Sequence, residues 1–124
     1  MIRWVYLIKY PEGVSVEDGE RWYLGTHTQE AKQMAEHGLV SYKTWRALTA
    51  PMGTKSRPAE FLNQWVRVTE LVFRDWDAYQ ASVIDSPIEY SGAPYGDKGF
   101  EYTTVFLGAE EPEYDLLAQV PRVG

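Results

Sequence analysis

Apolar and polar positions along this 124-residue chain follow two periods, one of two residues and one of three to four. Residues 2–10 alternate and place five large side chains on one face: Ile2, Trp4, Tyr6, Ile8 and Tyr10. This period predicts a β-strand. The other face also carries Val5 and Leu7, so we expect both faces of the strand to be at least partly covered.

The next segment has the period of a helix. Ser15 is typical of an N-cap, and acidic residues follow it in the first turns, where the helix dipole favours them. We predict a helix from Val16 to about Glu36, with an apolar stripe made of Val16, Tyr23, His27, Ala31 and Met34. Gly25 is a weak point at which a kink is expected, and His37-Gly38 is a typical C-terminal stop.

Alternation returns in three further segments, at 39–48 (LVSYKTWRAL), 65–73 (WVRVTELVF) and 102–107 (YTTVFL), which are predicted strands. A second, shorter helix is predicted from Trp76 to about Ile84, with Asp75 as its N-cap. The resulting order, βαββαβ, predicts a ferredoxin-like α+β fold. This fold has a four-stranded antiparallel sheet with both helices on one face.

No repeat or linker divides the chain, so we predict a single domain over 1–124, with a core at 1–108 and a C-terminal tail at 109–124. The sheet face without helices needs cover, because both strand faces carry apolar residues. We therefore predict a homodimer in which two such sheets pack face to face. Each subunit would then enclose a cavity between its sheet and its helices. The tail either packs across the partner subunit or frays.

Two stretches show neither the apolar pattern of a strand nor that of a helix. Residues 49–64 form a long predicted loop, which is either a functional lid or a solvated insertion. Residues 86–100 are rich in Gly and Pro, hold Tyr90 and Tyr95, and are also predicted to be a loop.

Composition narrows the class of protein. Aromatic residues make up 15% of the chain, more than a packed core needs, which favours a binding cavity or an interface. The absence of cysteine excludes disulfides, thiolate metal sites and a cysteine nucleophile. A net charge of -6 disfavours nucleic acid and anionic membranes as partners. The first residues are too short and polar for a signal peptide or membrane span, so a cytoplasmic location is expected.

The two histidines differ in their predicted places. His37 lies at the end of the first helix, where the helix dipole favours a surface cap. His27 lies on the apolar stripe, four residues after Tyr23. It is either a core histidine bonded to a backbone group, which is the commoner case for this spacing, or a group that moves protons near neutral pH.

Two strand residues are further candidates. Tyr42 is either a half-buried strand tyrosine or a donor to a substrate carbonyl or enolate oxygen. Glu70 stands in an otherwise apolar strand. It either pairs with Arg67 or Arg46, or faces the cavity as a base whose pKa burial raises.

Motifs for metal or cofactor chemistry are absent from the sequence. His27 and His37 are ten residues apart and do not share a helix face, which argues against a metal site. The chain has no phosphate-binding loop, dinucleotide fingerprint or nucleophile elbow. These observations argue against a metal site, a bound nucleotide phosphate and Ser-His-Asp catalysis.

The first 42 residues, MIRWVYLIKYPEGVSVEDGERWYLGTHTQEAKQM…GLVSYK, resemble the start of EthD-type proteins and of the related methylmuconolactone methylisomerase family. The matching positions are Pro11, Trp22-Tyr23, His27, Gly38-Leu39 and Tyr42. The later stretch VTELVFRDWDAYQAS resembles the strand and second helix of that family through Glu70, Phe73 and Asp75. The stretch 49–64 and the tail depart from the shorter family members.

The resemblance implies a dimeric α/β barrel without cofactor, in which His27 is the acid or base and Tyr42 an electrophile or orienting group. With Glu70, these are the predicted catalytic residues. The expected aromatic wall of the substrate site consists of Trp4, Tyr6, Trp22, Tyr23 and Trp45.

The expected activity is proton-transfer chemistry on a small, largely apolar, oxygenated aromatic or lactone-type compound. Isomerisation, a lyase reaction and dehydration all belong to this class, and aromatic catabolism or polyketide-like metabolism would supply such compounds. Two alternatives stay open: a non-catalytic small-molecule-binding accessory protein and a cofactor-free monooxygenase. The fold alone does not decide among them.

Overall fold

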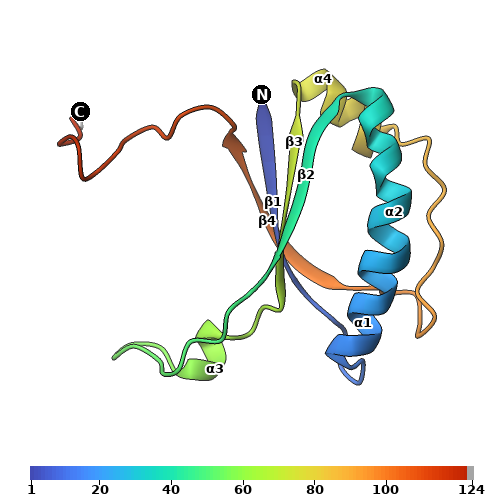
Figure 1. Cartoon of the computed structure of the whole chain (residues 1–124), viewed down its shortest axis with the longest axis horizontal. Coiled ribbons are helices and arrows are strands. Elements are labelled where there is room, and N and C mark those ends of the chain that lie inside the picture. Colours follow the sequence, from blue (N-terminus) through green and yellow to red (C-terminus); the bar gives the residue numbers. More distant parts are fainter. Residues whose placement is uncertain (123–124) are drawn as a thin grey trace.

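The computed structural model describes residues 1–122 and has the order βαββαβ (Figure 1). Its strands are β1 (Ile2–Lys9), β2 (Leu39–Arg46), β3 (Arg67–Phe73) and β4 (Glu101–Gly108). All neighbouring strands pair antiparallel, in the order β2-β3-β1-β4. The predicted ferredoxin-like α+β fold with one four-stranded antiparallel sheet is confirmed.

The first predicted helix is one continuous helical segment whose hydrogen-bond pattern changes along its length. Its parts are α1 (Val16–Trp22), the π-helical turn η1 (Tyr23–His27), α2 (Thr28–Ala31) and the 3₁₀ turns η2 (Lys32–His37). The Ser15 hydroxyl caps it by accepting the Asp18 backbone N–H at 3.1 Å. Gly25, the predicted weak point, lies in the middle of the π-helical turn.

The second predicted helix is confirmed as α4 (Trp76–Tyr79) followed by a π-helical turn, η3 (Gln80–Ile84). Asp75 caps it by accepting the Ala78 backbone N–H at 2.8 Å. The expectation of a plain loop over 49–64 is wrong in one place, because α3 (Ala59–Leu62) forms a single helical turn there. No helix within residues 1–122 combines the length and the apolar character needed to cross a membrane.

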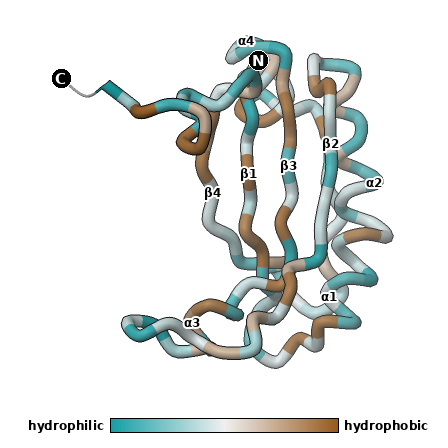
Figure 2. Tube along the Cα trace, turned by 60° about the vertical axis from the view of Figure 1, so that its left-hand side comes forward, coloured by the Kyte–Doolittle hydropathy of each residue, from teal (hydrophilic) through white to brown (hydrophobic). Residues whose placement is uncertain are grey.

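The two faces of the sheet differ sharply in cover. Both long helical segments lie on one side of the sheet (Figure 1), where the register aligns Trp4 with Leu71 and Phe106. One residue along, Val5 points to the opposite face, between Glu70 and Val105. Apolar positions recur along β1, β3 and β4 (Figure 2), so both faces carry them.

The face without helices, called here the open face, carries several exposed apolar side chains beside the Arg3–Glu70 ion pair. Trp45, Val105 and Leu107 on this face are 51%, 52% and 48% exposed. The loop that carries α3 and the residues after β4 both project on this side of the sheet (Figure 1). The start of the tail is tied to β1 by an ion pair of 2.6 Å between the Met1 amine and Glu110.

Candidate functional site

A cavity of about 210 Å³ lies between the sheet and the two helical segments. Seven aromatic side chains line it: Trp4, Tyr6, Tyr23, Tyr42, Tyr90, Phe100 and Tyr102. The remaining lining residues are His27, Ala31, Met34, Leu71, Ser82, Val83 and Ser86. None of these carries a full charge with His27 neutral, so the cavity suits a flat, uncharged molecule.

His27 stands in this pocket within a cage of rings. Its ring centroid lies 5.5 Å from that of Tyr23, 5.1 Å from Tyr90 and 5.3 Å from Phe100. No hydrogen bond joins its ring nitrogens to another residue within 1–122, so the interpretation as a core histidine bonded to the backbone does not fit. Burial lowers the pKa of His27, and the nearby Glu30 carboxylate opposes this only in part. The imidazole is therefore neutral near pH 7 and free to accept a proton.

Local helix geometry positions His27. In the turn Tyr23–His27 the Thr28 backbone N–H donates to the Tyr23 carbonyl, five residues back instead of four. The Leu24 carbonyl accepts the Thr28 hydroxyl at 3.1 Å. Such π-helical turns occur often at functional sites, and the second one, η3, contributes Ser82 and Val83 to the same pocket.

The pocket tyrosines are neutral donors. Burial raises the pKa of Tyr6 and of Tyr42, and neighbouring tyrosines add to the effect in both cases. Each phenol consequently keeps its proton at neutral pH and can donate it in a hydrogen bond. Burial likewise raises the pKa of Tyr23 to about 12, although its hydroxyl is already hydrogen bonded to Thr69 Oγ1 at 2.7 Å.

Residues 86–100, called here the strap, cover the His27 end of the pocket. Tyr90 stacks on the His27 ring at an interplanar angle of 27°, and Phe100 meets it edge-on at 63°. Glu30 holds the strap by accepting the Ser91 backbone N–H at 3.0 Å and the Ser91 hydroxyl at 2.9 Å. Residues 49–64 contribute nothing to the described lining, so they are not the cover of this pocket.

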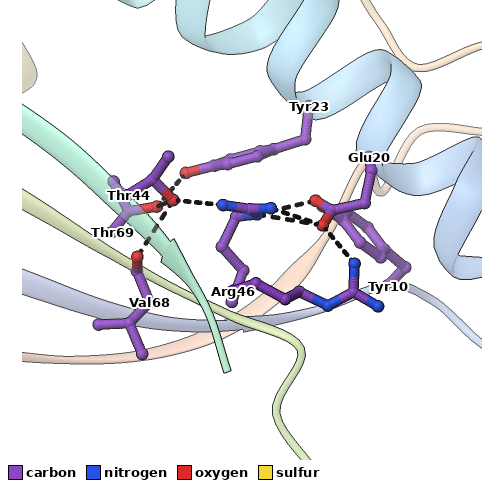
Figure 3. A network of polar contacts seen from close by, with 8 residues as sticks. Tyr10, Glu20, Tyr23, Thr44, Arg46, Val68 and Thr69 are labelled. Carbon is purple, nitrogen blue, oxygen red and sulfur yellow. Dashed lines mark hydrogen bonds and ion pairs between the residues drawn. The ribbon is translucent and has the colours of Figure 1, made fainter. Parts of the chain in front are cut away.

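A second polar cluster lies under the same helical segment, nearer its N-terminus (Figure 3). Glu20 accepts hydrogen bonds from Arg67 Nε at 2.9 Å and Arg67 Nη2 at 2.8 Å, from Arg46 Nη1 at 3.1 Å, and from the Tyr10 hydroxyl. Burial alone would raise the pKa of Glu20, but the bonds from Arg67 and Tyr10 outweigh it and hold the pKa below its ordinary value. Glu20, Arg67, Arg46 and Tyr10 are called here the Glu20 cluster, and both oxygens of its carboxylate accept hydrogen bonds.

The predicted site residues are thus divided. The pocket brings together His27, Tyr42, Trp4, Tyr6 and Tyr23. Trp22 lies behind His27, with 5.2 Å between their ring centroids, and does not line the cavity.

Two of the predicted site residues face the other way. Glu70 lies on the open face, where its carboxylate is 3.4 Å from Arg3 Nε, so the expectation of Glu70 as a base in the cavity is wrong. Trp45 also lies on the open face, opposite Val68, and is no part of the aromatic wall. The expected partners of Glu70, Arg67 and Arg46, bind Glu20 instead.

Sequence reasoning missed several lining residues. Tyr102 alternates with Thr104 and Phe106 on the helix side of β4, a signal the strand pattern contained. Tyr90 and Phe100 lie in a segment without periodicity, and Ser82 is a lone serine in an ordinary helix pattern. Among residues 1–122, no group of three or more His, Asp or Glu side chains gathers as a metal site.

The sequence matches no protein-family model and no curated protein. The fold, however, is similar to solved structures. The protein At3g17210 from Arabidopsis thaliana aligns with a TM-score of 0.55 and 12% identity, over 92% of this chain and 100% of that one. A dimeric ferredoxin-like protein from an uncultured marine organism aligns with a TM-score of 0.52 and 12% identity, over 90% and 96%. Likeness at this identity shows the ferredoxin-like fold, and the resemblance to EthD-type proteins stays a prediction.

Proposed function

We propose that this ferredoxin-like domain is a cofactor-independent enzyme that moves a proton on a small, oxygenated aromatic or lactone-type compound in the His27 pocket. The observation that supports it best is the state of the His27 imidazole, whose pKa is lowered and whose ring nitrogens make no hydrogen bond within residues 1–122. The ring lies in an aromatic cavity beside Tyr42, whose phenol is protonated. This is the combination that enolisation requires, a base and a neutral hydrogen-bond donor. It is also what the resemblance to EthD-type proteins implies for His27 and Tyr42.

In the proposed reaction, His27 removes a proton from a carbon next to a carbonyl group. The electron pair of the broken C–H bond moves into the C–C bond, and the carbonyl oxygen becomes negative. Tyr42 donates a hydrogen bond to that oxygen and stabilises the enolate. Return of the proton to a different carbon gives isomerisation, and loss of a β-substituent gives a lyase or dehydration reaction.

The test uses proton exchange, because it does not depend on the final product. A panel of enolisable lactones and arylacetones, with 4-hydroxyphenylacetone as first member, is incubated in D₂O, and loss of the α-proton signal is followed by NMR. We expect the wild type to accelerate exchange and His27→Gln to lower the rate about 10²–10⁴-fold. His37→Gln, at the helix end, is the matched control and keeps the wild-type rate.

The rate should rise with pH through a pKa below 6.5 and then level off, because only neutral His27 accepts the proton. A folded His27→Gln variant with the full rate would overturn the proposal. So would a wild type that exchanges no member of the panel faster than buffer.

A second candidate is a binding protein that holds such a compound without reacting. One observation favours it: no carboxylate or carbonyl within residues 1–122 hydrogen bonds to the His27 ring to fix its orientation. An NMR titration of His27 with and without ligand separates the two functions, because a binding protein predicts a ring that stays neutral in both. A binding protein also predicts that the His27→Gln variant still binds the ligand and that the protein exchanges no α-proton.

We also propose that two copies of the chain pair through their open faces. The half-exposed Trp45, Val105 and Leu107 support this, as does the dimeric state named for the similar marine protein. Sedimentation should give twice the chain mass of 14.3 kDa. Val105→Glu should give the single mass, whereas Ile84→Glu, an exposed position on the helix side, should stay paired.

A further inference from the structure

Two buried polar atoms of residues that line the pocket have no hydrogen-bond partner. Four buried side-chain nitrogen or oxygen atoms within residues 1–122 lack a hydrogen bond, and two of them, Trp4 Nε1 and Ser82 Oγ, belong to pocket residues. Trp4 is 8% exposed and Ser82 1%. A buried donor left unpaired costs about 1–3 kcal/mol, so neither atom stabilises the protein without a ligand.

The position of Ser82 sharpens this point. A serine or threonine inside a helix commonly donates to the carbonyl four residues back. Thr28, beside the other π-helical turn, does so with Leu24 at 3.1 Å. Ser82, inside η3, makes no such bond. Its hydroxyl is therefore free for a group that enters the pocket.

These two donors lie well away from His27. Met34 packs in one cluster with Trp4, and it is seven residues beyond His27 on the helix, about 10 Å along the axis. The turn that holds Ser82 packs against the same part of the helix, Lys32–His37. The pocket is consequently a slot with His27 at one end and the Trp4–Ser82 pair at the other.

Donor chemistry narrows what can bind at that end. An indole N–H only donates, so its partner is an acceptor, and the serine hydroxyl can donate to the same atom. No lysine or arginine lines the pocket, and an anion buried without a cation is costly. The partner is therefore a neutral oxygen of the carbonyl, ether or hydroxyl type.

We propose that Trp4 and Ser82 form an oxygen-binding subsite, and that the ligand is an uncharged ring compound with one oxygen at His27 and a second at this subsite. The inference rests on the proposed function in one respect, namely that the pocket beside His27 takes up a small molecule. It adds the second polar contact and excludes carboxylates and phosphates from the far end. The size agrees, since an apolar cavity of about 150 Å³ holds benzene and this one is about 210 Å³.

The test compares two probes of nearly equal shape. 4-Hydroxyacetophenone carries oxygens at opposite ends of its ring, and 4-isopropylphenol lacks the carbonyl oxygen. We expect 4-hydroxyacetophenone to move the Trp4 indole N–H resonance downfield and 4-isopropylphenol to leave it nearly unchanged. Both probes should perturb the His27 ring protons.

Calorimetry with Ser82→Ala provides the second arm. We expect the affinity for 4-hydroxyacetophenone to fall about three- to tenfold, and that for 4-isopropylphenol to change less than about twofold. Ser41→Ala, on the open face, is the control and should change neither affinity. The variant should be as stable as the wild type, because Ser82 makes no bond in the free protein.

The outcomes separate this inference from the proposed function. If both probes perturb His27 but the indole resonance stays in place and Ser82→Ala binds both as before, the subsite is refuted alone. If neither probe perturbs His27, the pocket does not take this class of compound and both proposals fall. The NMR arm uses the wild type only, so it holds even if a variant does not fold.

Discussion

The Glu20 cluster and the His27 pocket lie under the same helical segment and on the same face of the sheet, yet they treat polar groups in opposite ways. The Glu20 carboxylate is engaged by Arg67, Arg46 and Tyr10, all within hydrogen-bond distance. In the pocket, Trp4 Nε1 and Ser82 Oγ have no hydrogen-bond partner among residues 1–122. Tyr23 separates the two regions, with its ring in the pocket and its hydroxyl on Thr69.

The contrast separates polar groups that stabilise the fold from polar groups that we propose bind a ligand. Buried polar atoms are nearly always hydrogen bonded, and the Glu20 cluster follows that rule. Two buried atoms of pocket residues, Trp4 Nε1 and Ser82 Oγ, do not follow it. The helix changes with it, from α-helical over the Glu20 cluster to π-helical at His27.

The largest effect is expected from a substitution in the Glu20 cluster. Glu20→Ala leaves Arg67, whose side chain is 11% exposed, without its carboxylate, and we expect the free energy of unfolding to fall by about 3 kcal/mol. Glu17→Ala removes an exposed carboxylate bound to Arg21 on the same helix and should change stability by less than about 0.5 kcal/mol. Urea denaturation of both variants measures this. Equal losses would show that the cluster is no more than a surface network.

Two glycines probe the packing difference between the regions. A Cβ on Gly19 would lie 2.2 Å from the Tyr10 ring, so Gly19→Ala should destabilise by about 1–3 kcal/mol. A Cβ on Gly25 meets nothing within 4 Å, so Gly25→Ala should stabilise by about 0.4–1 kcal/mol. Thermal unfolding of the two variants measures whether each substitution raises or lowers stability. A destabilised Gly25→Ala would mean that the π-helical turn needs glycine for its backbone.

Each region should also have its own window of pH dependence. His27 binds its proton less readily in the folded protein, so the free energy of unfolding falls as pH drops below 6.5 toward the lowered pKa. Glu20 holds its charge more firmly when folded, so its contribution is lost as pH drops below 4.5 through its lowered pKa. His27→Gln should remove the upper window only. Retention of that window would assign it to another group.

The smallest expected effect concerns the link between His27 and the strap. The Glu30 carboxylate raises the pKa of His27 against the effect of burial, so Glu30→Gln should lower that pKa further. Glutamine can still accept from Ser91, which keeps the strap in place. NMR titration of His27 measures the change. An unchanged pKa would show that solvent screens this charge.

Much of the fold could be predicted from the sequence because its signals are local. The strand at β1 and the segment of α4 and η3 match their predicted bounds within a residue or so. His27 and Tyr42 meet in one pocket as expected, since the helix stripe and the strand alternation point to the same side. These predictions needed only the spacing of apolar residues along the chain, which repeats every two residues in a strand and every 3.6 residues in a helix.

The rest depended on contacts distant in sequence. The strand around Glu70 is apolar on both faces, so the face that Glu70 takes follows from the register with β1 and not from its own pattern. From its local sequence, Glu20 is predicted only as an acidic residue favoured by the helix dipole. Its partner Arg67 is 47 residues away, so the local pattern does not predict the pairing. Tyr90 reaches His27 from the strap through tertiary packing alone.

The π-helical turn Tyr23–His27 has a consequence for how such a pocket is gained or lost in evolution. This turn holds one residue more than the same stretch of α-helix would, as the five-residue hydrogen bond from Thr28 to Tyr23 records. Deletion of one residue there would restore the four-residue hydrogen bond of an α-helix, so that Thr28 and the residues after it keep their places while the side chains inside the turn change direction. The sheet and the Glu20 cluster would stay as they are. The direction of the histidine ring is thus the feature of this pocket that a single insertion or deletion at the turn would change first.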